Sequence, residues 1–183
     1  MKMSVFQVDA FTAKPFRGNP AAVVFMEDWL PEHWLQGFAN DMNLSETAFL
    51  VKENGRYRLR WFTPRVEVEL CGHATLAAAH VLWENGRVSP SEEVVFTTLS
   101  GELRARRKEE WIELVFPMEN AHEVPPPTGL AEALKAQILW VGRSRFDYLV
   151  EVESEETLKK LKPDFSLLQT LAVRGVIVTS LSH

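Results

Sequence analysis

Residues 69–83 decide the fold, and they read ELCGHATLAAAHVLW. From Ala74 to Trp83 the residues are small or apolar, with no sustained polar face. A helix of this composition is surrounded by protein, whereas a helix on the surface shows one polar side. The stretch therefore predicts a buried helix over residues 74–84, around which the rest of the chain is arranged.

The entry to this helix follows a predicted strand. Residues 66–70 alternate between apolar and charged side chains, and Gly72 and His73 then mark a sharp turn. The N-terminus of a helix presents unpaired backbone N–H groups and a partial positive charge. We therefore expect a place for a carboxylate or a phosphate where the strand ends and the helix begins.

The segments on either side have the patterns of strands. Alternating or continuous apolar runs predict strands at 5–11, 21–25, 46–51, 57–61, 66–70, 94–98, 102–107 and 111–116. An amphipathic helix begins near Pro31, with Trp34, Leu35 and Phe38 on one stripe. Because a helix that is apolar on all sides needs protein on all sides, the sequence predicts an α+β fold. In this fold a mixed, barrel-like sheet wraps around the buried central helix.

The three prolines at positions 125–127 interrupt these patterns. They predict a domain at 1–118, a proline-rich linker at 119–127 and a partial second domain at 128–183. Residues after Pro127 predict helices near 131–135 and after Ser154, and strands at 138–141, 148–152 and 173–179. We expect this second domain to be incomplete, since it offers few apolar positions for a core of its own.

The composition excludes several classes of protein. The chain has 183 residues, 46% of them apolar, and a net charge of −5 from 20 basic and 25 acidic residues. This charge does not fit nucleic-acid binding or a polybasic membrane anchor, and no segment reaches the roughly 18 apolar residues of a membrane span. The dense basic run at 104–108 alternates with apolar residues, which predicts the solvated face of a hairpin. A single cysteine excludes an intrachain disulfide and predicts a cytoplasmic protein.

A few polar residues are candidates for chemistry. Glu46 stands where a loop meets a strand, and it is either a surface charge or a catalytic carboxylate. His73 either caps the helix or polarises a bound carbonyl or carboxylate. Cys71 is either an inert buried thiol or a base whose pKa the helix N-terminus lowers. Gly18 and Asn19 form either a simple turn or a loop that brings bare backbone to a ligand.

The sequence predicts neither a metal nor a cofactor. The five histidines do not stand at ligand spacings from the cysteine or from carboxylates. The chain also has no glycine-rich nucleotide loop and no nucleophile elbow, so it does not resemble a kinase, a nucleotide-dependent oxidoreductase or a serine hydrolase of that kind.

Six segments stand in order along the chain: VDAFT (8–12), FRGNPAAV (16–23), NLSETAF (43–49), RWFTP (60–64), LCGHATLA (70–77) and TLSGEL (98–103). Together they resemble the signature blocks of the PhzF-like phenazine-biosynthesis isomerase family. The resemblance implies the diaminopimelate-epimerase-like fold, with two similar domains that each wrap sheet around a central helix. It also implies an active site in the cleft between the domains.

The resemblance further implies an isomerase that needs no cofactor or metal and acts on a small carboxylated metabolite. Glu46 would carry the proton as general acid and base, and His73 would lie against the substrate. The positions that would bind the substrate are Gly18, Asn19, Gly72, Ala74 and Thr75. In the epimerase relatives cysteines transfer the proton, but in this family a glycine takes the place of the first of them. Cys71, one residue earlier, would therefore be a bystander.

One departure from the family pattern leaves two alternatives. The family's second domain contributes a block of the type Gly-Asp-Pro-Val-Thr-Gly-Ser, and this sequence has no such block. The chain would then be either a shortened isomerase or a catalytically incomplete module that binds a ligand or a protein. A homodimer is a third expectation, in which the surface of one copy closes the site of the other.

Overall fold

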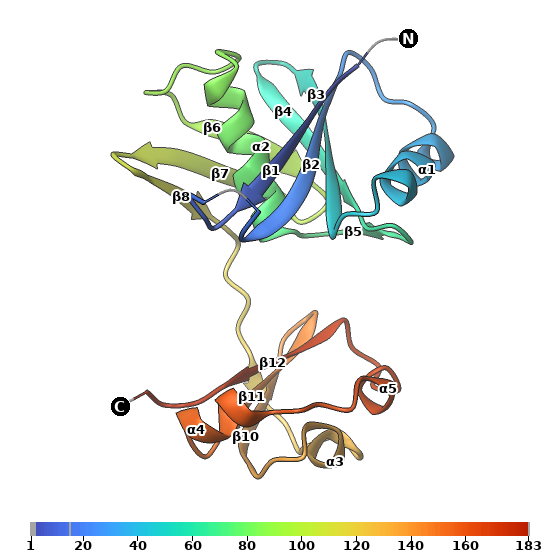
Figure 1. Cartoon of the computed structure of the whole chain (residues 1–183), viewed down its shortest axis with the longest axis vertical. Coiled ribbons are helices and arrows are strands. Elements are labelled where there is room, and N and C mark those ends of the chain that lie inside the picture. Colours follow the sequence, from blue (N-terminus) through green and yellow to red (C-terminus); the bar gives the residue numbers. More distant parts are fainter. Residues whose placement is uncertain (1–2, 15, 183) are drawn as a thin grey trace. The chain divides into compact units, whose positions relative to one another are not determined.

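The computed structural model describes residues 3–14 and 16–182 (Figure 1). The chain divides into two compact units, residues 1–117 and residues 118–183. Residues 119–127, predicted as a linker, hold strand β9 (His122–Glu123), which pairs with the sheet of the second unit. Val124 also packs against the core of that unit. The segment just before the three prolines is therefore part of the second unit.

The first unit is built on one mixed sheet of eight strands. These are β1 (Ser4–Ala10), β2 (Asn19–Met26), β3 (Glu46–Glu53), β4 (Arg56–Phe62), β5 (Glu67–Val68), β6 (Val94–Thr98), β7 (Gly101–Lys108) and β8 (Trp111–Val115). The order is β1-β2-β3-β4-β6-β7-β8, and β5 pairs with β4. The pairs β2/β3 and β4/β6 are parallel, and the other pairs are antiparallel. The expected strands are all present, although β5 is shorter than predicted.

Helix α2 (Gly72–Glu84) lies inside the curve of this sheet, as Figure 1 shows. Nine of its 13 residues are buried. Its core neighbours come from β2, β3, β4, β6 and β7 and include Trp61, Phe96 and Leu103. The prediction of an α+β fold with sheet around a buried central helix is confirmed, and the helix begins two residues earlier than expected.

Helix α1 (Glu32–Met42) packs on the opposite face of the sheet, against β3 and β4. Strands β2 and β3 are therefore covered on both faces. Along β2, Val23 and Phe25 pack in the α2 core, whereas Val24 and Met26 pack in the α1 core. This double burial explains why these strands are continuously apolar and do not alternate.

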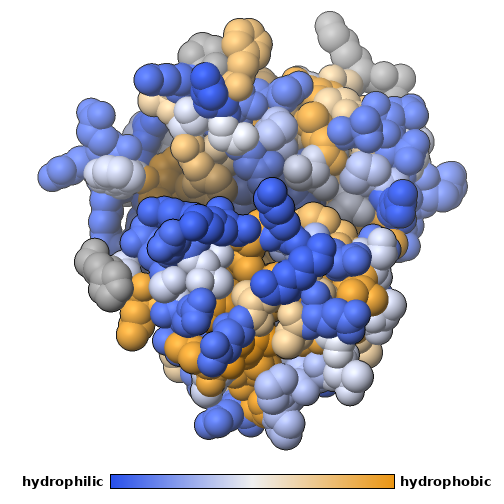
Figure 2. Space-filling model, turned by 60° about the horizontal axis from the view of Figure 1, so that its bottom comes forward, coloured by the Kyte–Doolittle hydropathy of each residue, from blue (hydrophilic) through white to orange (hydrophobic). Residues whose placement is uncertain are grey.

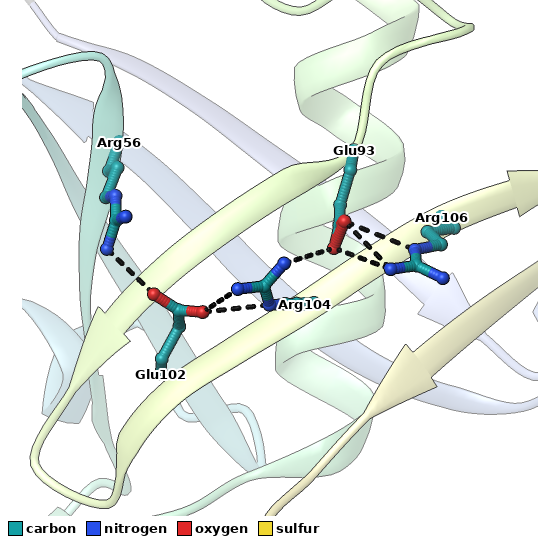
Figure 3. A network of polar contacts seen from close by, with 5 residues as sticks. All are labelled: Arg56, Glu93, Glu102, Arg104 and Arg106. Atoms are coloured by element: carbon teal, nitrogen blue, oxygen red, sulfur yellow. Dashed lines mark hydrogen bonds and ion pairs between the residues drawn. The ribbon is translucent and has the colours of Figure 1, made fainter.

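The basic run lies on β7 of the β7/β8 hairpin, and residues 106–108 are exposed, as predicted. Arg104 and Arg106 share one face of the strand, whereas Arg107 contacts Glu84 and Trp83 of α2. Figure 3 shows how acidic residues neutralise Arg104 and Arg106. Glu102 binds both Arg104 and Arg56, the latter at 2.7 Å between Oε2 and Nη1. Glu93 accepts hydrogen bonds from Arg104 and Arg106. These arginines are thus occupied by intrachain ion pairs along the sheet.

The second unit has a four-stranded sheet, ordered β12-β11-β10-β9. Its other elements are α3 (Leu130–Leu134), β10 (Ile138–Arg143), β11 (Asp147–Val152), α4 (Glu155–Lys160), α5 (Phe165–Leu168) and β12 (Gly175–Thr179). Leu130, Leu134 and Val150 are fully buried, so this unit has a larger core of its own than the composition suggested. Other apolar side chains stay exposed, including Leu139 and Ile177. Figure 2 shows hydrophobic patches, in orange, among hydrophilic residues on one face of the molecule.

The position of α2 generates a stability prediction. Leu82 is fully buried against the sheet, so Leu82→Ala should lower the free energy of unfolding by about 2–5 kcal/mol. Urea denaturation followed by tryptophan fluorescence measures this. The exposed Leu99 provides the control, since Leu99→Ala should change stability by less than about 0.5 kcal/mol. Equal effects of the two substitutions would contradict the central place of α2.

Candidate active site

Glu46 is the first residue of β3, next to Ala21 of β2 in the parallel register. Residues two apart on a strand point to the same face, so Glu46 faces the α2 side together with Ala48 and Leu50. Its side chain keeps 20% exposure. The carboxylate therefore stands at the rim of the core, largely withdrawn from water but still partly exposed.

The N-terminus of α2 lies at the same rim. Cys71 is the residue before the helix, and no side chain caps the first turn. The N–H groups of such a turn are free of partners within the helix. An added Cβ on Gly72 would meet only Phe116, at 3.9 Å, and Gly72 is exposed. Packing within the described residues thus does not require this glycine, and its bareness keeps the helix end accessible.

His73 links the two features. Its Nε2 atom lies 3.3 Å from Oε2 of Glu46, and its Nδ1 atom lies 3.5 Å from Sγ of Cys71. The side chain is nine-tenths buried. The contact with Glu46 has the distance of an ion pair but not the geometry of a hydrogen bond, so Nε2 has no hydrogen-bond partner among the described residues. A buried polar atom without a partner is costly and points to a ligand.

The thiol of Cys71 is held in its protonated form. Burial raises its pKa to about 12, and the negative charge of Glu46 acts in the same direction. The backbone N–H groups of Ala74 and His73 lower the pKa but do not offset these effects. Of the two readings of Cys71, the structure favours the unreactive thiol, because the thiolate is the reactive species.

The loop before β2 lies close to the loop before Glu46. The hydroxyl of Ser45 donates to Oδ1 of Asn19 at 3.1 Å. Gly18 has a φ of +85°, and an added Cβ would lie 2.1 Å from the carbonyl oxygen of Ala10. Only glycine fits there, so the fold itself accounts for Gly18, and the contact with Ser45 ties Asn19 to the loop that precedes Glu46.

Two predicted binding residues are fully buried. Ala74 and Thr75 have no exposed surface, and the Thr75 hydroxyl donates to the carbonyl of Cys71 at 2.5 Å. Their side chains fix the first turn of α2. Ala74 and Thr75 could therefore bind a substrate only through the backbone N–H groups of this turn. Their role in binding stays a prediction.

The structure adds a cluster that sequence spacing concealed. Glu46, Cys71 and His73 each place a ligand-type atom within 4.8 Å of the others. The spacing along the sequence does not show this cluster, because the fold brings Glu46 to residues 25 and 27 positions later. The one signal in the sequence was the pair Cys71 and His73 themselves, two residues apart.

Comparison with known proteins identifies the family. A family model described as phenazine biosynthesis-like protein matches residues 8–183. An uncharacterized isomerase of Halalkalibacterium halodurans is 51% identical over 183 residues, which cover all of this chain and 69% of that protein. An uncharacterized isomerase of Pseudomonas aeruginosa is 48% identical and is covered over 70% of its length.

Solved structures agree with the fold. A crystal structure of a PhzF-family protein from Enterococcus faecalis is 45% identical and has a TM-score of 0.85, over 98% of this chain and 69% of that one. A hydroxyproline epimerase from Agrobacterium vitis shares the fold alone, with a TM-score of 0.56 at 12% identity, over 86% of this chain and 53% of that one. None of the described helices has the length and apolar character that a membrane crossing needs.

The isomerase names of the relatives and the epimerase-like fold point to isomerase activity, and the chain belongs to the phenazine biosynthesis-like PhzF family.

Proposed function

We propose that this chain moves a proton on a small carboxylated metabolite, with Glu46 as the general acid and base. The observation that carries the proposal is the contact of 3.3 Å between Glu46 and His73 beside an uncapped helix N-terminus. A carboxylate, an imidazole and free backbone N–H groups thus converge on one exposed rim. No metal or cofactor is part of the proposal.

Each group has a defined task in this reaction. The N–H groups of the first turn of α2 would hold the substrate carboxylate, aided by the positive end of the helix dipole. This fixes a neighbouring C–H bond near Glu46. The Glu46 carboxylate takes the proton from carbon, leaving the electron pair delocalised in the substrate. The resulting carboxylic acid then returns the proton at a second position, so the enzyme is unchanged.

His73 supports this transfer without carrying the proton between carbons. Its buried Nε2 faces the Glu46 carboxylate and has no hydrogen-bond partner of its own among the described residues. In the tautomer with a proton on Nε2 it would donate toward the carboxylate or toward a substrate oxygen. Asn19 would supply a further polar group, since it accepts a hydrogen bond from Ser45, the residue before Glu46. This arrangement orients both the carboxylate and the substrate.

A non-catalytic binding module is the second candidate. It is supported by the uncapped N-terminus of α2, which is able to bind a carboxylate without any proton transfer. Its ligands would stabilise the protein without exchanging their protons, which separates it from the isomerase.

Exchange with solvent tests the role of Glu46. Small carboxylic acids with acidic C–H bonds are incubated with the protein in D₂O, and loss of proton signal is followed by NMR. The chain should catalyse exchange into at least one of them, and Glu46→Gln should slow it by roughly 10²–10⁴-fold.

The matched control for this experiment is Glu53→Gln, at the exposed far end of the same strand. It should leave the rate unchanged. Exchange that persists in Glu46→Gln would exclude Glu46 as the base, and compounds that raise the melting temperature but never exchange would favour the binding module.

The pKa of Cys71 gives a separate prediction. With a pKa of about 12 in place of 9.0, the thiol should be alkylated by iodoacetamide at pH 8 at least about a hundredfold more slowly than in the urea-unfolded chain. Mass spectrometry of quenched samples measures both rates. Equal rates would show a reactive thiolate and would return Cys71 to the list of candidate proton carriers.

We also propose a homodimer in the cytoplasm, supported by exposed apolar side chains of the second unit such as Leu139 and Ile177. Burial of such side chains between two copies would be favourable. Light scattering at micromolar concentration should give twice the mass of the 20.9 kDa chain. A monomeric mass would remove the proposal.

A further inference from the structure

Cys71, His73 and Glu46 together offer the ligand set of a thiophilic divalent cation. The three residues contribute one sulfur, one nitrogen and one oxygen atom, all within 4.8 Å of one another. Zn²⁺ takes this mixture of ligands, and zinc sites with three protein ligands keep a fourth position open. We propose that Cys71, His73 and Glu46 form a binding site for Zn²⁺ at the N-terminus of α2.

The spacing of the atoms fits this ion. A tetrahedral zinc with bonds of about 2.3 Å to sulfur and about 2.0 Å to nitrogen holds these two atoms about 3.5 Å apart. Sγ of Cys71 and Nδ1 of His73 lie 3.5 Å apart. The Glu46 carboxylate lies within 4.8 Å of the other ligand atoms, and because its Oε2 atom faces Nε2 at 3.3 Å, it must turn toward Sγ and Nδ1 to become the third ligand.

The surroundings of the cluster favour a cation. The His73 side chain is nine-tenths buried and Cys71 is 7% exposed, so the nitrogen and sulfur donors are shielded from water. The Glu46 carboxylate adds an oxygen donor at the more open side of the cluster. Zn²⁺ binds this combination of donor atoms, and a largely buried set of three donors leaves few water molecules to compete for the ion.

The partial exposure of Glu46 leaves an entry path and room for the fourth ligand. Glu46 keeps 20% exposure, and Gly72, the residue before His73, is exposed. On binding, zinc–sulfur, zinc–nitrogen and zinc–oxygen bonds form, the S–H bond breaks and its proton passes to solvent. A water molecule would complete the tetrahedron. No oxidation or reduction takes place.

Zinc in this position would inhibit the proposed isomerisation. It would occupy the electron pair with which Glu46 takes a proton and would hold His73 in a metal bond. This consequence rests on the proposed function, but the binding itself does not. The site is therefore a place where a metal ion and a proton compete for the same carboxylate.

Cobalt(II) titration of the untagged chain tests the binding. Co²⁺ replaces Zn²⁺ in such sites and gives a sulfur-to-metal charge-transfer band in the near ultraviolet. One equivalent of Co²⁺ should produce this band, and added Zn²⁺ should remove it. If excess Co²⁺ gives no such band with the wild-type chain, the proposal is overturned whether or not any variant folds.

Variants assign the ligands. Cys71→Ser should abolish the band, and His73→Gln and Glu46→Gln should each weaken Co²⁺ binding by roughly tenfold or more. His33→Gln, at an exposed histidine of α1, is the matched control and should bind like the wild type. A band that survives in folded Cys71→Ser, as judged by circular dichroism, would also overturn the site.

The metal and the isomerisation can fail separately. The cobalt band is recorded without substrate, so it reports binding even if no compound undergoes exchange. If exchange is found, Zn²⁺ should inhibit the wild type at the concentrations that displace Co²⁺. Exchange that is unaffected by saturating Zn²⁺ would contradict the inhibition while leaving the isomerase assignment intact.

Discussion

The packing of α2 inside a curled sheet is the constraint on which the rest of this structure depends. Alanines at 77, 78 and 79 have no exposed surface, and their small side chains allow the sheet to approach the helix closely. The larger Trp61, Phe96 and Leu103 reach inward from the strands and fill the space that the alanines leave. The helix therefore has little freedom to shift along its axis, and its first turn is held at a fixed height beside the start of β3.

The fixed position of the first turn of α2 beside the start of β3 determines which groups meet at the candidate active site. The first N–H groups of a helix have no partner within the helix, and here no side chain caps them. The helix end thus keeps donors for a bound acceptor. The parallel pairing of β2 with β3 places Glu46, and through Ser45 also Asn19, at this same end.

Much of this could be predicted from the sequence, because the main signals are local. The uniform apolarity of residues 74–83 predicts the burial of α2, and the alternation along β7 predicts a solvated basic face. In the structure, Glu93 and Glu102 bind the arginines of this face. The cluster of Glu46 with His73 and Cys71 has no local signal, since it depends on strand register. The family resemblance pointed to Glu46 and His73 without their distance. Strand β9 was missed because two paired residues leave no periodic pattern beside a run of prolines.

Cys71 separates the two properties proposed for this site, which are proton transfer by Glu46 and the binding of a metal ion. Proton transfer by Glu46 needs a carboxylate and an orienting partner, and His73 supplies the latter at 3.3 Å. Metal binding needs the sulfur as well, because an imidazole and one carboxylate give only two ligands. The buried thiol keeps its proton because its pKa is raised, so it does not supply the thiolate that could act as a base. A dication, however, can displace this proton. A protein of this fold with serine in place of this cysteine would thus keep the elements for proton transfer and lose the strongest zinc ligand. The residue that is least useful for the proposed catalysis is therefore the one that determines whether a metal ion can block it.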